Sequence, residues 1–401
     1  MIVIVSAVFA PEPVVTAMIS LDLAKELALD NKVTVLSPSP TRPFGKIYNE
    51  EDIKNKDFNF NHIVLNSYTC PQSNIIGRGR ESYSFGKKVE SYIEKYANDI
   101  DLVYANTWPL FSQKIIVDVL KKYNIPLVLH IQDIYPESIS KKIPFIGGLM
   151  NKVFLPMDKY ILANSSEIIT ISNRMKQFLV KSRNIDPENI NVVRNWQDDK
   201  SFKISHENQN NKDDIFTFMY VGSINSSANV ELVIDAFGKI DLKNSQLVIA
   251  GDGSEKINCI EKSKKYKEKN IQFITVEPKE VPLLQSKADV LILPLKKGIA
   301  KTALPSKLTA YMLSSKPVLA SLDLDSEVFD IISQNKCGIV CNPEEENELM
   351  EQMYNLYKED KEVLIEMGRN SFSYAQLNLT KKINLSKIVA IINNNLKERN
   401  A

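Results

Sequence analysis

The segment from Lys296 to Val318, KKGIAKTALPSKLTAYMLSSKPV, has the residue types and spacing of an anion-binding loop that enters a helix. A predicted strand ends at Leu293, and after a basic loop the first helical turn holds Pro305, Ser306 and Lys307. Proline fits the first helical position, the unpaired amides of that turn attract an anion, and Lys307 adds a full positive charge. The spacing suits a pyrophosphate, and it equally fits an exposed loop with an ordinary lysine.

Polar side chains also follow a predicted strand in the first half of the chain. His130, Gln132 and Asp133 lie at the carboxyl end of the run 126–131. Polar groups at such a strand end are costly unless they are hydrogen-bonded or functional. They form either a catalytic cluster or a turn network in which Asp133 caps a helix. Glu137 faces an acceptor hydroxyl or favours a helix N-terminus.

Two further motifs have simpler interpretations. Asp323-Leu324-Asp325 places two carboxylates on one edge of an extended segment, as a clamp for a metal and a diphosphate requires. It follows a late strand, where a solvated loop is the favoured interpretation, so we expect no essential metal ion and no cofactor. Gly251-Asp252-Gly253 fits a tight turn at a strand end.

Short β-branched runs alternate with amphipathic helix patterns in both halves of the chain, which is typical of a doubly wound parallel sheet. In the first half, the predicted strands span 2–9, 32–36, 62–65, 102–105, 126–131, 167–171 and 190–193, and the predicted helices 16–28, 85–96 and 114–123. In the second half, the strands span 216–221, 246–250, 271–275, 290–293, 318–320 and 338–340, and the helices 230–237, 306–313 and one from near Thr380.

The polar segment between these two series shows no hydrophobic pattern and indicates a linker. We predict an N-terminal domain over 1–196, a linker over 197–214, a C-terminal domain over 215–376 and a C-terminal helix over 377–401 that packs back toward the N-terminal domain. The fold class is α/β, with two Rossmann-like domains and a ligand crevice where the carboxyl ends of the two sheets meet.

Composition excludes several classes of function. Fifty Lys and Arg against 49 Asp and Glu give a net charge of +1, so no global field attracts nucleic acid. The four cysteines, 70, 259, 337 and 341, lack zinc-site spacing and indicate reduced thiols in a cytoplasmic protein. Residues 1–10 predict a buried strand rather than a signal peptide, and no apolar run reaches the about 20 residues of a membrane span.

Two basic segments could lie on a membrane surface. Residues 141–163 place a hydrophobic stripe beside lysines, and residues 75–88 place two isoleucines ahead of Arg78, Arg80, Lys87 and Lys88. A helix that faces the core and has a solvated basic side fits both segments equally well. The stripe consists of Phe145, Leu149, Met150, Val153, Phe154 and Met157, with Lys141, Lys142, Lys152 and Lys159 around it.

The motif PSKL-x-x-YM-x-x-x-KPV resembles the donor-binding helix of family 4 retaining glycosyltransferases, which have the GT-B architecture of two Rossmann-like domains facing across a cleft. The resemblance extends over nearly the whole chain, through FAPEP, YVGS, GDG and the pair Asn195-Trp196. Residues 130–138, HIQDIYPES, resemble the HxQDxxPES signature of the subgroup that transfers deoxy-aminosugars such as N-acetylfucosamine in bacterial surface polysaccharide synthesis.

This resemblance implies roles for individual residues. Lys307 and the start of its helix would stabilise the departing diphosphate, and Gly222 and Ser223 would form the opposite wall. Val276 would help to hold the uracil ring with backbone groups. The implied donor-binding set is Gly222, Ser223, Arg194, Asn195, Asp252, Val276, Ser306, Lys307 and Leu308, the catalytic set is Lys307, Gln132, Asp133 and His130, and the acceptor-binding set is Glu137 and Pro13.

The sequence departs from the family pattern at several places. Thr302 and Ala310 stand where two glutamates usually hold the sugar and the ribose, and Ser223 and Ala228 replace a usual Arg and Lys. Lys307 would then be the main cation on the diphosphate, assisted by Arg194 or Lys301. The loop 13–16 lacks the usual pair of glycines.

The resemblance implies a retaining transfer of a sugar, an N-acetylated deoxy-hexosamine, from a UDP-sugar to a polyprenyl-diphosphate-linked saccharide at the inner face of the cell membrane. In this family the leaving diphosphate takes the acceptor proton, so catalysis is mostly positioning and charge stabilisation. Two alternatives remain open. One is a catalytically silent protein that binds a sugar nucleotide or a partner enzyme, and the other is a UDP-sugar 2-epimerase.

Overall fold

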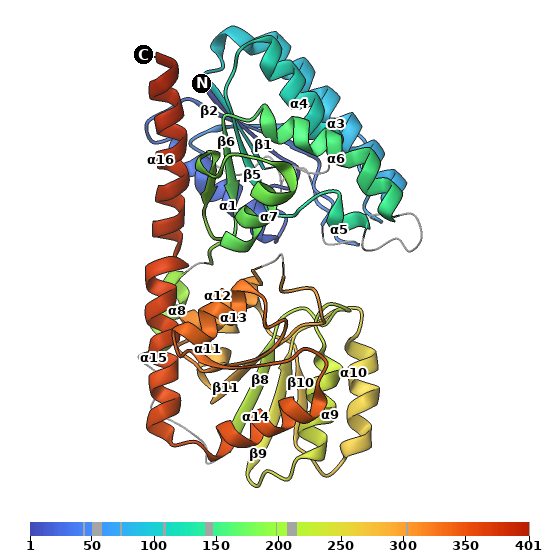
Figure 1. Cartoon of the computed structure of the whole chain (residues 1–401), viewed down its shortest axis with the longest axis vertical. Coiled ribbons are helices and arrows are strands. Elements are labelled where there is room, and N and C mark those ends of the chain that lie inside the picture. The colour runs from blue at the N-terminus through green and yellow to red at the C-terminus, as the bar shows by residue number, and fades with distance from the viewer. Residues whose placement is uncertain are drawn as a thin grey trace. The chain divides into compact units, whose positions relative to one another are not determined.

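The computed structural model describes residues 1–42, 45–49, 58–72, 74–106, 110–140, 147–197, 199–206, 215–301 and 304–400. The chain forms two compact units, Met1–Asn195 together with Asn384–Ala401 (unit 1) and Trp196–Ile383 (unit 2). Each unit is a twisted parallel sheet with helices packed on its faces (Figure 1).

Unit 1 contains, among its described residues, a sheet of seven strands that all pair in parallel. Its central strands are continuous runs of buried β-branched and aliphatic residues, as expected when helices cover both faces. In spatial order the strands are β3 (Asn61–Leu65), β2 (Val33–Pro38), β1 (Ile2–Ser6), β4 (Leu102–Asn106), β5 (Leu127–Ile131), β6 (Glu167–Thr170) and β7 (Ile190–Val192). The helices are α1 (Val15–Leu27), α3 (Ile75–Tyr96), α4 (Leu110–Lys122), α5 (Glu137–Ser140), α6 (Gly147–Ala163), α7 (Asn173–Arg183) and most of α16 (Lys381–Asn400).

Unit 2 contains a six-stranded parallel sheet within the described residues. In spatial order the strands are β10 (Ile271–Ile274), β9 (Ser245–Ala250), β8 (Phe216–Val221), β11 (Val290–Pro294), β12 (Val318–Ser321) and β13 (Gly338–Cys341). The helices are α8 (Asp199–His206), α9 (Val230–Lys239), α10 (Lys256–Ser263), α11 (Val281–Ser286), α12 (Ser306–Leu313), α13 (Glu327–Gln334), α14 (Glu346–Lys358) and α15 (Lys361–Asn378).

The predicted fold class, two Rossmann-like parallel sheets, is confirmed, and every predicted strand is found with its ends displaced by three residues or fewer. The strand order reverses between β1 and β4 in unit 1 and between β8 and β11 in unit 2. Ligands of such sheets bind beyond the carboxyl ends of the strands at this reversal point. The residues that follow β1, β4, β5, β8 and β11 are therefore the ones to examine for chemistry.

Helix boundaries differ more from the sequence-based expectation. The predicted linker 197–214 contains helix α8, which its polar composition does not indicate, and residues 198 and 207–214 lie outside the described part. Helix α3 begins ten residues before the predicted start at 85, because Asn74 caps it by accepting a hydrogen bond from the amide of Gly77. Helix α16 returns to unit 1, where Arg399 donates to the carbonyl of Ile100 at 2.8 Å.

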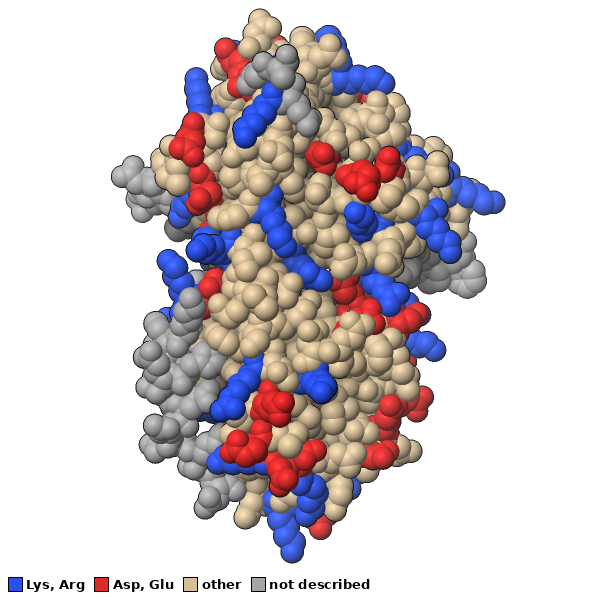
Figure 2. Space-filling view, turned by 60° about the vertical axis from the view of Figure 1, so that its left-hand side comes forward, with Lys and Arg blue, Asp and Glu red and all other residues tan. Residues whose placement is uncertain are grey.

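The charge distribution on the surface and the state of the cysteines match what the composition predicts. In the view of Figure 2, basic and acidic side chains alternate over the visible face without a large area of one sign. All four cysteines are buried and free, and no helix in the described part of the chain has the length and hydropathy of a membrane span.

Candidate active site

Gly222 follows the last residue of strand β8 at the reversal point of unit 2. Its φ of +148° lies in the region that favours glycine, and its amide donates to the carbonyl of Ala250 at 2.9 Å. A β-carbon at this position would lie only 2.0 Å from the Cε atom of Lys307. The absence of a side chain at 222 therefore lets the lysine of helix α12 lie along the end of the strand.

Lys307 is held in this position mainly by packing. Its Nζ lies 5.3 Å from the centroid of the Tyr220 ring and 3.5 Å from the carbonyl oxygen of Ser223. No carboxylate within 4 Å of this ammonium is found among the described residues. Burial lowers the pKa of Lys307 to about 8, because a desolvated ammonium without an anion nearby is disfavoured. An anionic ligand would relieve this cost.

Helix α12 spans Ser306–Leu313, the predicted range, and Pro305 is its extended N-cap rather than its first helical residue. The amide of Leu308, an implied diphosphate contact, donates to the carbonyl of Pro305 at 3.0 Å, and the Leu308 side chain is buried. Ser306 and Lys307 are half-buried. Of the two positions where the family has glutamates, Ala310 is buried in the core and Thr302 lies outside the described residues.

Tyr311 fixes helix α12 against strand β8. Its buried hydroxyl accepts from the amide of Val221 at 2.9 Å and donates to the carbonyl of the same residue at 3.0 Å. This pair of bonds places the first turn of the helix beside Gly222. Tyr311 belongs to the PSKL motif, but the motif alone does not indicate its role. A tyrosine on a buried helix face requires a partner for its hydroxyl.

The other implied donor contacts of unit 2 lie on neighbouring loops. Gly251 packs on the backbone of Gly222, since a β-carbon at 251 would lie 2.0 Å from the Gly222 carbonyl oxygen. Asp252 is exposed and accepts from the amide of Gly253 at 2.8 Å, as in a local turn. Val276 is half-buried after β10 and packs against the core. Ser223 is exposed beside Gly222.

The Asp323-Leu324-Asp325 motif secures the basic loop before α12. Both oxygens of the buried Asp323 carboxylate accept from the amide of Gly298, at 2.9 and 2.8 Å. Asp325 pairs with Lys301 at 2.7 Å, so the predicted assistant cation already has an anionic partner. The motif therefore fixes a loop. The expectation of a solvated loop holds for Asp325 but not for Asp323, whose carboxylate is buried on a backbone amide.

In unit 1, a cavity of about 60 Å³ lies beyond the carboxyl ends of β4 and β5. Three predicted catalytic residues, His130, Gln132 and Asp133, all line it. His130 is 2% exposed, and burial lowers its pKa to about 3, so the imidazole is neutral. Further polar residues of the lining are Thr16 of α1, Asn106 at the end of β4, Gln113 of α4, Asp158 of α6 and Tyr135.

Two hydroxyl groups hold the predicted catalytic side chains. The Tyr104 hydroxyl lies 2.6 Å from Nδ1 of His130, and Thr16 donates to Oε1 of Gln132 at 2.6 Å. Sequence reasoning missed Tyr104 because it resembles a core aromatic within a strand. The pairing of β4 with β5 would have indicated the contact. Tyr104 pairs with Val128, and His130 lies two residues further on the same face of β5.

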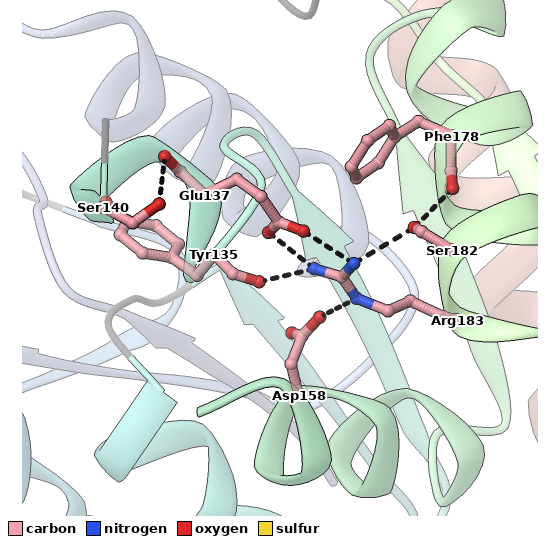
Figure 3. Close-up of polar contacts among 7 residues, drawn as sticks. All are labelled: Tyr135, Glu137, Ser140, Asp158, Phe178, Ser182 and Arg183. Atoms are coloured by element: carbon pink, nitrogen blue, oxygen red, sulfur yellow. Dashed lines mark hydrogen bonds and ion pairs between the residues drawn. The ribbon is translucent and has the colours of Figure 1, made fainter. Parts of the chain in front are cut away.

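Arg183 anchors the loop that follows β5 (Figure 3). This buried guanidinium donates to both carboxylate oxygens of Glu137 at 2.8 and 2.7 Å, to Asp158 at 2.6 Å and to the carbonyl of Tyr135 at 2.9 Å. Burial raises the pKa of Asp158 to about 6, and the hydrogen bond from Arg183 opposes this shift. Glu137 lies in the first turn of α5, and its carboxylate is engaged by Arg183.

The predicted acceptor residue Pro13 lies exposed in the loop after β1. Its neighbour Glu12 is buried, and its carboxylate accepts from the amides of Thr41 and Arg42, both at 2.8 Å. Arg194 and Asn195 end the first segment of unit 1, and the amide of Arg194 donates to Asn384 of α16 at 3.1 Å. The bonds of Glu12 hold the loop beside Pro13, the predicted acceptor contact. The bond to Asn384 holds the backbone at Arg194, a predicted donor contact.

The basic segments are only partly exposed. Phe154 and Met157 of α6 pack against the core of unit 1, whereas Val153 is 59% exposed. Phe145, Lys141, Lys142 and the side chain of Leu149 lie outside the described part. In the second segment, Arg78 is buried and paired with Glu81, while Ile75 and Ile76 are exposed.

Comparisons with known proteins agree with this architecture. Residues 17–200 match the model of Glycosyltransferase Family 4, and residues 201–373 match that of Glycosyl transferases group 1. "Probable glycosyltransferase WbjE" of Pseudomonas aeruginosa is 22% identical over 281 residues, which are 66% of this chain and 67% of that protein.

Two solved structures share the fold. HepE of Anabaena in complex with UDP superposes with a TM-score of 0.71 at 15% identity over 98% of this chain and 99% of that one. The sucrose-phosphate synthase of Thermosynechococcus elongatus gives a TM-score of 0.74 at 15% identity over 98% of each chain. The two family models, which together match residues 17–373, identify this chain as a glycosyltransferase, and the shared fold is of the GT-B type.

Proposed function

We propose that the protein transfers a sugar from a UDP-sugar to a lipid-linked saccharide, with retention of configuration, during bacterial surface polysaccharide synthesis. The observation that carries this proposal is the half-buried ammonium of Lys307, which lies beside Gly222 at the reversal point of unit 2. A buried cation next to a helix N-terminus favours an anionic ligand such as a diphosphate.

The donor would bind unit 2 with its diphosphate between Lys307 and the strand end at Gly222. As the bond to the anomeric carbon breaks, negative charge grows on the diphosphate, and Lys307 and the start of α12 would stabilise it. The acceptor hydroxyl would lose its proton to the leaving diphosphate on the same face of the sugar. His130, Gln132 and Asp133 of unit 1 would bind the transferred sugar, while Arg194 and Asn195 would assist at the donor.

Similar proteins support a nucleotide-sugar donor. HepE of Anabaena has been solved with UDP and with UDP-glucose, and WaaG is described as a glycosyltransferase involved in lipopolysaccharide biosynthesis. For this chain we propose an N-acetylated deoxy-hexosamine as the sugar, because HIQDIYPES resembles the corresponding signature. No essential metal ion is proposed, since the carboxylates of the D-x-D motif are bound to Gly298 and Lys301.

A second candidate is a protein that binds a sugar nucleotide without transferring the sugar. The observation in its favour is Ala310, whose buried methyl group cannot hold a hydroxyl where the family usually has a glutamate. UDP release across a panel of UDP-sugars, with and without a lipid-linked saccharide, separates the two candidates. Acceptor-dependent release supports transfer, whereas tight UDP binding without release in any combination would support the silent protein. Mass analysis of the sugar product would reveal a 2-epimerase.

We also propose peripheral contact with the inner face of the membrane through the start of α3. Ile75 and Ile76 are 51% and 80% exposed, and Arg80 follows one turn later. Sedimentation with anionic vesicles tests this contact. Loss of binding in the Ile75→Ser/Ile76→Ser variant would support it, and wild-type protein that stays in the supernatant would refute it.

A further inference from the structure

Two nitrogen atoms, in side chains of residues that line the cavity of unit 1, have no hydrogen-bond partner within the described residues. They are Nε2 of His130 and Nε2 of Gln132, and both atoms are fully buried. Buried polar atoms are nearly always paired, so two of them at one small cavity indicate a ligand that supplies the missing acceptors. At its other end, each of the two side chains meets a hydroxyl group of the protein.

The bond between Tyr104 and His130 determines which ring nitrogen carries the hydrogen. Tyr104 is completely buried, and His130 is its one hydrogen-bond partner in the described part of the chain. A hydrogen on Nδ1 would leave the phenol hydrogen without an acceptor, which is costly in a buried site. Burial also raises the pKa of Tyr104, so the phenol keeps its hydrogen. Tyr104 therefore donates, Nδ1 accepts, and the hydrogen of the neutral imidazole resides on Nε2.

Thr16 performs the same function for Gln132. Its hydroxyl donates to the amide oxygen at 2.6 Å, and the NH2 group has no partner among the described residues. Thr16 comes from helix α1 and Tyr104 from strand β4, so two separate elements occupy the acceptor atoms of the two side chains.

We propose that Tyr104 and Thr16 are positioning residues that present His130 and Gln132 to the cavity as two neutral N–H donors for a hydroxyl oxygen of the transferred sugar. Neutral donors match an uncharged hydroxyl, whereas an ammonium group would find no acceptor on either side chain. The identity of the ligand as a sugar rests on the proposed function. The arrangement of hydrogens rests only on the contacts of the free protein.

Imidazole ¹⁵N NMR of the free protein tests the hydrogen arrangement directly, because the chain has three histidines and His130→Gln identifies one set of signals. We expect His130 as the Nε2–H tautomer with unchanged shifts between about pH 5 and about pH 9. In the Tyr104→Phe variant, the ¹⁵N signals of His130 should shift toward the other tautomer or show a mixture of both tautomers. A wild-type Nδ1–H tautomer, or titration near the ordinary pKa of histidine, would overturn the inference whether or not the protein is a transferase.

Kinetics on the full chain test the consequence. Tyr104→Phe and Thr16→Val should each lower kcat/KM about tenfold while the Kd for UDP stays unchanged, because one oriented donor is lost. Thr16→Ser should keep near-normal rates. Tyr357→Phe is the matched control, since it removes a hydroxyl that donates to the carbonyl of Lys243 far along the chain in unit 2.

Wild-type kcat/KM in both Tyr104→Phe and Thr16→Val would refute the positioning role and leave the proposed function standing. If no UDP-sugar is turned over at all, the proposed function fails and the NMR result alone decides the inference.

Discussion

Lys307 occupies the space that a side chain at position 222 would need. A β-carbon built on Gly222 would lie 2.0 Å from Cε, 2.9 Å from Cδ and 3.2 Å from Nζ of the lysine. The end of strand β8 thus contacts helix α12 where the Lys307 side chain packs along the backbone of Gly222. The position of the positive charge at the strand end depends on this contact.

Gly222→Ala should displace Lys307 and weaken UDP binding about tenfold or more, measured by calorimetry. The control is Gly45→Ala in unit 1, which also has a positive φ but has no atom within 4 Å of the added carbon. That variant carries backbone strain without displacing the lysine. Equal UDP affinities for wild type and Gly222→Ala would show that the contact does not position the charge.

UDP affinity should fall as the pH rises through about 8. The free protein loses the Lys307 proton there, because the pKa lies below the ordinary 10.5, whereas the complex with an anion keeps the proton. Binding therefore takes up a proton, and Kd should rise by up to about tenfold per pH unit above that point. Lys307→Arg should bind UDP with a flat profile over the same range. A flat profile for the wild type would contradict the assignment of the lowered pKa.

Arg183→Met should lower the free energy of unfolding by about 3–5 kcal/mol, because it leaves the buried carboxylate of Asp158 and the half-buried carboxylate of Glu137 without their cation. Lys114→Met breaks the exposed pair with Asp118 and should cost less than about 1 kcal/mol. Urea denaturation of the two variants provides the comparison. Similar losses in both would mean that the Arg183 network does not hold the loop after β5.

Transfer should proceed unchanged in a chelator, and Asp325→Asn should stay within about twofold of the wild-type rate, because Asp325 forms an exposed pair with Lys301. Asp323→Ala should reduce the rate more, since it releases the amide of Gly298 and the loop before α12. Activity that disappears in chelator and returns with Mn²⁺ would assign the motif to a metal.

The strands could be predicted because helices cover both faces of each sheet, and each strand is then a short run of aliphatic residues with turn residues at its ends. The same pattern placed His130, Gln132 and Asp133 at the carboxyl end of one strand, and all three line the cavity beyond β5. The PSKL motif likewise placed Lys307 in the first turn of a helix over 306–313, the range that α12 has.

The partners of these residues could not be predicted. Arg183 meets Glu137 across 46 residues of sequence, and Thr16 meets Gln132 across 116 residues, so no local pattern joins either pair. Tyr104 resembles any core aromatic until the register of β4 with β5 brings it beside His130. Helix α8 was missed because its residues are mostly polar, and its stability comes from packing rather than from a visible stripe.

The most direct test of the proposed function is acceptor-dependent UDP release by Lys307→Ala, Lys307→Arg and the wild type with a UDP-sugar that the wild type uses. Loss of the ammonium should lower kcat at least about a hundredfold while the thermal unfolding curve stays cooperative, and arginine should restore part of the rate. A Lys307→Ala enzyme that turns over at a near-normal rate would contradict the account.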